Sequence, residues 1–124
     1  MNQPKGNYLR LMAKAENVKQ ADLARKLRKV QTESDHIKAQ AGSVSRMLEE
    51  HGKSLKAVQT TAQLANSLRL GQQLEGFRNS LTLQRKQSEL RLKKAKTDLA
   101  HCGHKLDILT EKARVTEARE KNSD

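Results

Sequence analysis

The sequence predicts an all-α protein built as one long antiparallel coiled-coil hairpin of two helices. Two segments carry apolar or small residues at alternating spacings of three and four, which is the a/d seam of a coiled coil. The seam of the first segment comprises Leu23, Leu27, Val30, Ser34, Ile37, Ala41, Val44 and Leu48. The seam of the second comprises Leu92, Ala95, Leu99, Cys102, Leu106, Leu109 and Ala113. Because a lone helix cannot bury such a seam, we expect the two segments to pack against each other.

Composition agrees with this fold and limits the alternatives. The chain of 124 residues contains two aromatic residues, no Trp and a single Pro near its start, so a thick globular core is excluded. A composition this polar is also found in disordered chains, but the sustained heptads favour helix for all except residues 1–7 and 122–124. We therefore expect one coiled-coil domain over residues 1–124.

The first arm is expected over residues 8–51, with Asn7 as its N-cap. Its early seam is poor, because the phase that brings Ala13 inward also brings Glu16 and Gln20 inward. Gly52 is placed for a left-handed C-cap, and Ser54 for the N-cap of a new helix.

A bend or tip is expected over residues 52–73, where Gly71 weakens the helical pattern. The second arm then occupies residues 74–121. When the arms are laid antiparallel with Leu48 opposite Leu74, large residues repeatedly face small ones. The facing pairs include Val44 with Arg78, Ala41 with Leu81, Ile37 with Arg85, Ser34 with Ser88, Leu27 with Ala95, Gln20 with Cys102 and Glu16 with Leu106. A slip of one heptad keeps the phase, so the register stays open.

No pattern in the chain indicates catalysis. His101, Cys102 and His104 are the only cluster of soft metal ligands, and three ligands without a fourth make an incomplete structural site. The simpler interpretation makes Cys102 a small seam residue between two solvated histidines. There is no glycine-rich phosphate loop and no Ser-His-Asp pattern. We expect no enzyme, no catalytic residue, no metal, no cofactor and no small-molecule substrate.

Charge carries more information. Lys and Arg number 25 against 14 Asp and Glu, a formal net charge of +11 that points to an acidic partner. Two basic clusters fall at the same height of the predicted hairpin and form a collar, defined as Arg25, Lys26, Arg28, Lys29, Arg91, Lys93, Lys94 and Lys96. Such runs are often only solvated helix faces. A docking site for an acidic surface is the second interpretation, and both stay open.

The second half of the chain resembles a known family. The resemblance is carried by Leu74, Phe77, Leu81, the polar run Gln84, Arg85, Lys86 and Gln87, and the charged heptads from Glu89 to Glu120. These residues resemble the central stalk family of type III secretion systems, the flagellar FliJ and injectisome YscO-like proteins, with the shorter injectisome branch the closer likeness. The resemblance implies a shaft that docks in a hexameric secretion ATPase, promotes its activity and contacts the export gate. It also implies binding to export chaperones and a place at the inner-membrane secretion apparatus.

Two other classes remain open from the residues alone. A nucleic-acid-binding coiled coil needs only clustered Lys and Arg, although aromatic residues for stacking are nearly absent. A holdase or adaptor coiled coil is the third class. With neither a signal peptide nor a membrane span in the sequence, we expect a cytoplasmic protein. We also expect the hairpin to be monomeric, since its two seams satisfy each other.

Overall fold

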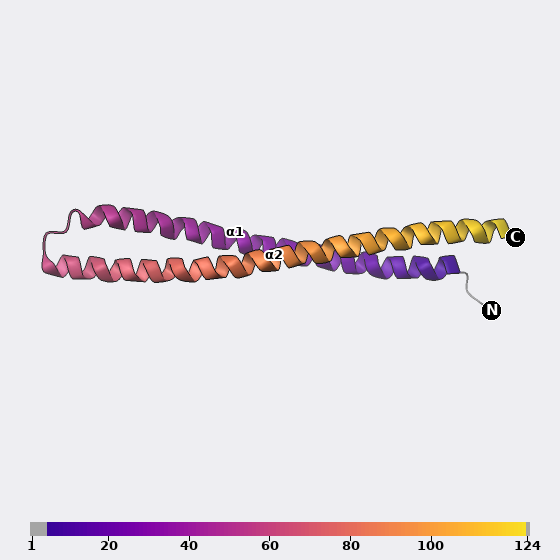
Figure 1. Ribbon diagram of the computed structural model, residues 1–124, viewed down its shortest axis with the longest axis horizontal. Coiled ribbons are helices and arrows are strands. Elements are labelled where there is room, and N and C mark those ends of the chain that lie inside the picture. The colour runs from indigo at the N-terminus through magenta and orange to yellow at the C-terminus, as the bar shows by residue number, and fades with distance from the viewer. Residues whose placement is uncertain (1–4, 124) are drawn as a thin grey trace. The chain divides into compact units, whose positions relative to one another are not determined.

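The structure, a computed structural model, describes residues 5–123, and this part of the chain contains two helices and no strand. Helix α1 spans Lys5–Leu55 and helix α2 spans Thr61–Ser123 (Figure 1). The predicted all-α, two-helix hairpin is confirmed. Helix α1 begins before the expected N-cap at Asn7, and α2 extends beyond the expected end at residue 121. The expected tails at residues 1–4 and 124 lie outside the described residues.

Residues 56–60 connect the helices, and a capping box sets the start of α2. The N–H of Gln63 donates to Thr60 Oγ1 at 3.1 Å, and the N–H of Thr60 donates to Gln63 Oε1 at 3.3 Å. This reciprocal pair satisfies two N–H groups that a helix N-terminus otherwise leaves without a partner. A T-x-x-Q pattern is therefore what starts α2.

The expected break at Gly52 and Ser54 is wrong. Both residues lie inside α1, and no described glycine has the positive φ that a left-handed C-cap requires. The backbone leaves α1 only after Leu55, where the N–H of Ala57 donates to the carbonyl oxygen of Ser54 at 3.0 Å. The non-helical connection is consequently much shorter than the bend expected over residues 52–73, and Gly71 lies inside α2.

The chain divides into two units, each built from a segment of both helices. Unit 1 comprises Met1–Lys29 with Leu92–Asp124, and unit 2 comprises Val30–Arg91. Within each unit the α1 and α2 segments are antiparallel, and the predicted seam residues form the buried or half-buried layer between them.

The seam of unit 1 is made of small residues packed among leucines. Its buried positions are Ala13, Ala95, Cys102, Leu109 and Ala113. The half-buried positions around them are Leu9, Leu23, Leu27, Leu92, Leu99 and Leu106. Large residues alternate with small ones, so the two helices can approach closely without leaving voids.

Polar contacts also tie the two helices of unit 1 together. Arg10 donates two hydrogen bonds to the carboxylate of Glu117, from Nε at 2.9 Å and from Nη2 at 3.1 Å. This guanidinium lowers the pKa of the Glu117 carboxyl. The N–H of Gly6 donates to Glu120 Oε1 at 3.1 Å. The first turns of α1 are thus joined to the last turns of α2.

The seam of unit 2 is thinner on its α2 side. Its buried residues are Val30, Ser34, Val44, Leu81 and Ser88. The expectation that Arg78 and Arg85 fill the layers opposite Val44 and Ile37 is wrong, since both arginines are exposed. Each pairs with a carboxylate of its own helix, at 2.8 Å from Glu75 and 3.2 Å from Glu89. Both guanidinium groups stay hydrated in this way. As a result, the layers opposite Val44 and Ile37 lack an apolar contact from α2.

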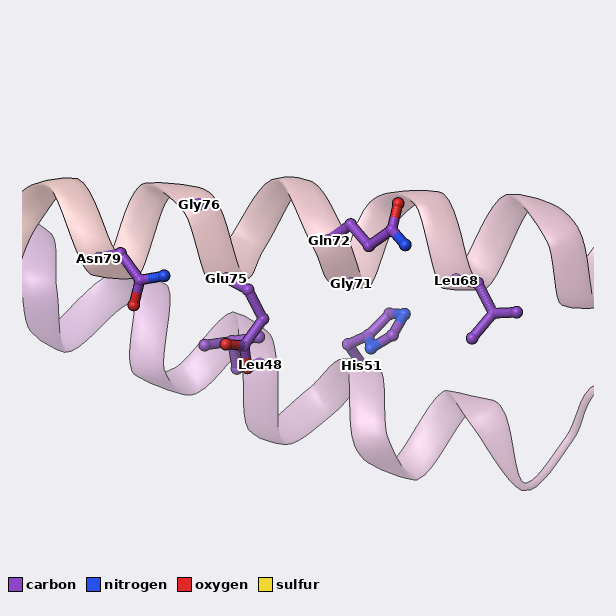
Figure 2. Close-up of a pocket in the computed structure, with 8 residues that line it drawn as sticks. All are labelled: Leu48, His51, Leu68, Gly71, Gln72, Glu75, Gly76 and Asn79. Atoms are coloured by element: carbon purple, nitrogen blue, oxygen red, sulfur yellow. The ribbon is translucent and has the colours of Figure 1, made fainter.

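A histidine joins the two helices of unit 2 near the connection. His51 lies with Nε2 2.6 Å from the carbonyl oxygen of Ser67, so this nitrogen donates the hydrogen bond. Figure 2 shows the His51 ring turned toward Gly71, in a pocket that Leu48 and Leu68 also line. A Cβ added at Gly71 would lie 2.8 Å from His51 Cε1. Glycine at this position therefore makes room for the ring.

The two glycines of α2 that face this region give a matched test. Gly76→Ala adds a Cβ that meets nothing within 4 Å, so we expect helix propensity alone to stabilise the protein by roughly 0.5–1 kcal/mol. Gly71→Ala brings the same propensity gain but displaces the His51 ring, so its net gain is smaller or absent. Urea denaturation followed by circular dichroism measures both variants. Equal stabilisation by the two substitutions would contradict the close approach of His51.

Candidate functional site

All eight residues of the predicted collar are exposed. Helix α1 presents one group of four and helix α2 presents the other. Seven of the eight lie in unit 1 and are called the unit 1 basic cluster: Arg25, Lys26, Arg28, Lys29, Lys93, Lys94 and Lys96. The eighth, Arg91, is the last residue of unit 2, where its Nη1 lies 3.9 Å from Glu33 Oε2.

Seam packing holds the two halves of the unit 1 basic cluster beside each other. Leu27 and Ala95, the seam residues at the centres of the two basic segments, both turn inward. Leu23 and Asp98, at one end of these segments, line the same pocket. Since the helices are antiparallel, α1 residues 25–29 must lie along α2 residues 92–96. The structure thus brings together the basic segments that the sequence placed at one height.

The electrostatic balance around the unit 1 basic cluster is strongly positive. The sequence has no acidic residue between Leu23 and Thr32, and none between Leu90 and Thr97. Asp22, one turn before the cluster, forms an ion pair with Arg25. Exposed cations grouped on two adjacent helices raise the local potential, which attracts an acidic surface and accelerates its association. The arrangement can bind anions.

A second polar cluster in unit 1 explains how Glu16 is tolerated inward. The Glu16 side chain is 13% exposed, and its Oε1 lies 3.1 Å from Lys105 Nζ. The hydrogen bond from Lys105, and then the one from Cys102, lowers the pKa of the Glu16 carboxyl. Sequence reasoning identified the inward glutamate but missed Lys105. The signal was available, because Lys105 directly precedes the residue that the register sets opposite Glu16.

Cys102 is buried in the seam and lies against Glu16. Its Sγ lies 3.3 Å from Glu16 Oε2 and 3.4 Å from the Glu16 carbonyl oxygen. Burial, followed by the contact with the Glu16 carboxylate, raises the pKa of the thiol. A protonated, buried thiol is a poor nucleophile and a poor metal ligand.

His101 and His104 do not converge with Cys102. Both histidines are exposed, whereas the Cys102 side chain is buried in the seam. Within residues 5–123 no three His, Cys, Asp or Glu side chains are grouped in a way that could hold a metal ion.

Neither described helix has an apolar stretch long enough to cross a membrane. Comparison with family models, with curated proteins and with solved structures finds no match.

Proposed function

We propose that this chain is a central stalk component of a type III secretion ATPase complex, which docks in the hexameric ATPase and promotes its activity. In this proposal the stalk also contacts the export gate and binds export chaperones. Its place is cytoplasmic, at the periphery of the inner-membrane secretion apparatus. The observation that carries the proposal is the exposed unit 1 basic cluster, because such a cluster can bind the wall of a central pore lined with acidic residues.

The pairing of the two helix ends supports docking through unit 1. The contacts of Gly6 with Glu120 and of Arg10 with Glu117 hold both helices together beyond the unit 1 basic cluster. An element that enters a ring must keep a narrow and constant cross-section, and two closely packed helices provide one. The small seam residues Ala13, Ala95 and Ala113 keep the helices close.

Charge reversal tests the proposal. The variant carries Arg25→Glu, Lys26→Glu, Arg28→Glu and Lys29→Glu, and the assay is ATP hydrolysis by the purified secretion ATPase of the same organism. We expect wild-type chain to stimulate hydrolysis and the variant to leave it at the basal rate, because repulsion replaces attraction at the docking surface. Circular dichroism checks that helicity is kept.

A matched control separates local from overall charge. Reversal of four exposed basic residues of unit 2 changes the net charge by the same amount, and it is expected to leave stimulation intact; these residues are Lys38, Arg46, Lys56 and Arg69. Unchanged stimulation in the unit 1 variant would overturn the basic cluster as the ATPase contact. Absence of stimulation by the wild-type chain would overturn the stalk proposal itself.

The same cluster also favours a second candidate function, binding of nucleic acid. Clustered lysines and arginines neutralise phosphates whatever the sequence, and such binding weakens steeply as salt increases. Titration of the chain with random duplex DNA at several salt concentrations measures this directly. A steep salt dependence would favour nucleic acid over the ATPase. So would a capture experiment with the tagged chain in which nuclease treatment of the cell lysate removes every bound partner.

A further inference from the structure

An apolar stripe lies on the outer side of α1 in unit 1, away from the seam with α2. Tyr8, Leu11, Ala15 and Val18 follow one another at spacings of three, four and three, which is again the spacing of a coiled-coil seam. All four residues are exposed, and the three large ones are between 52% and 64% exposed. On a single helix this spacing places them in one line. Unit 1 therefore presents a second seam that α2 does not cover.

The flanks of the stripe are positively charged. Lys14 lies along one side and Lys19 along the other, and both are exposed. Carboxylates on the seam side lie near both lysines: Glu16, which Lys105 binds, lines a pocket with Lys19, and Asp107 lines another with Lys14. Asp22, the next residue along the stripe, is paired with Arg25. A helix that lies on the stripe therefore meets lysines on both sides.

We infer that this outer face of α1 binds an amphipathic helix of a partner protein, one whose own apolar stripe is flanked by Asp and Glu. Spacing and charge both select this occupant. Helices pair through narrow a/d stripes, and opposite charges beside the stripe choose the partner and its direction. The stripe consists of other residues than the unit 1 basic cluster, which follows it on α1, and the proposal holds whether or not the ATPase is the partner of that cluster.

Two other occupants fit less well. A second copy of this chain would place lysines against lysines, in a chain whose net charge is already +11. An anionic membrane surface prefers a helix with a broad apolar face. Here the apolar stripe is widened only by Met12, which is 36% exposed, and Lys14 and Lys19 lie directly beside it.

The probe is a synthetic 21-residue amphipathic peptide with Leu at its a and d positions and Glu at its e and g positions. It is labelled and titrated with the full chain, and binding is followed by fluorescence anisotropy. The variant Leu11→Glu with Val18→Glu places two carboxylates in the stripe. We expect it to weaken binding by at least about tenfold, because two apolar side chains lose their contact with the peptide and like charges meet.

The matched control is Leu83→Glu with Leu90→Glu on α2. These leucines are exposed and seven residues apart, as Leu11 and Val18 are, but polar residues separate them and no stripe forms. We expect this control to bind the peptide as wild type does. Equal weakening by the two variants would overturn the proposal, since it would trace the effect to net charge.

Reversing the charge of the two flanking lysines provides an independent experiment. Lys14→Glu with Lys19→Glu is expected to lose the Glu-flanked peptide and to gain binding of a second peptide with Lys at the same flanks. Vesicles of phosphatidylglycerol are titrated in parallel. The proposal is overturned in favour of a membrane surface if wild type binds the vesicles but neither peptide, and the variant Leu11→Glu with Val18→Glu no longer binds the vesicles.

Discussion

Replacing Leu81 by alanine is expected to lower the free energy of unfolding by about 2–5 kcal/mol. Leu81 is the only large apolar side chain of α2 that is buried within the described part of unit 2. It faces α1, lining a pocket with Ala39, Gln40 and Ser43. Truncation removes its transfer free energy and leaves a cavity. Because Arg78 and Arg85 turn outward on either side, no neighbouring layer can compensate for the loss.

The control for this prediction lies two residues further along the same helix. Leu83 is 59% exposed, against 6% for Leu81, so the same substitution at Leu83 removes little buried surface. Leu83→Ala is expected to change the unfolding free energy by less than about 0.5 kcal/mol. Urea denaturation followed by circular dichroism compares the two. Similar losses at both positions would mean that Leu81 does not pack against α1.

Enlarging Ala113 is expected to destabilise unit 1 by about 1–3 kcal/mol. The residue is 0% exposed, so the three additional carbon atoms of a leucine have no free volume to enter. Ala113→Leu must push α1 away from α2, which also disturbs the hydrogen bonds from Arg10 to Glu117 one turn further along.

Ala118→Leu is the matched substitution, because Ala118 is exposed on the same helix. It adds the same atoms toward solvent and is expected to be neutral within about 0.5 kcal/mol. Thermal unfolding of both variants at one protein concentration gives the comparison. An unchanged transition in Ala113→Leu would show that the helices can separate there without loss.

Heptad spacing was sufficient to predict the fold and most of its buried layer. Every residue of the two predicted seams is buried or half-buried, including the polar Ser34, and so is Ser88, which the register sets opposite Ser34. Contacts also agree with the proposed register, since Gly71 meets His51 and Gly103 lies beside Gln20. The signal is strong because an apolar face sustained over many turns must be buried, although heptad spacing alone also permits a slip of seven residues.

Single residues were less reliable guides, both at the connection between the helices and at the seam layers of Arg78 and Arg85. Gly52 looked like a helix end, yet a glycine costs only about 1 kcal/mol inside a helix, which the neighbouring turns can offset. The start of α2 follows from the capping pair of Thr60 and Gln63, a pattern that is present in the sequence. Arg78 kept the seam spacing but turned outward, because spacing fixes the direction of Cβ and not the end of a long flexible side chain.

For the candidate site, too, the sequence predicts one part and only the structure reveals the other. Exposure of the basic residues and the alignment of the two basic segments follow from sequence, since both depend on heptad phase and register. The outer stripe beginning at Tyr8 was not foreseen. Its spacing was visible, but only the structure shows that α2 covers the opposite side of α1 and leaves Leu11 and Val18 exposed.

The hydrogen bonds across the hairpin differ greatly in the length of chain that they enclose. His51 and Ser67 are 16 residues apart, whereas Gly6 and Glu120 are 114 apart. Closing the longer loop from the unfolded chain costs about 1.7 kcal/mol more in entropy. Once the shorter loop has formed, each further turn encloses only a small additional length. Folding should therefore begin at residues 56–60 and proceed as a zipper, with the contacts of Gly6 and Arg10 formed last.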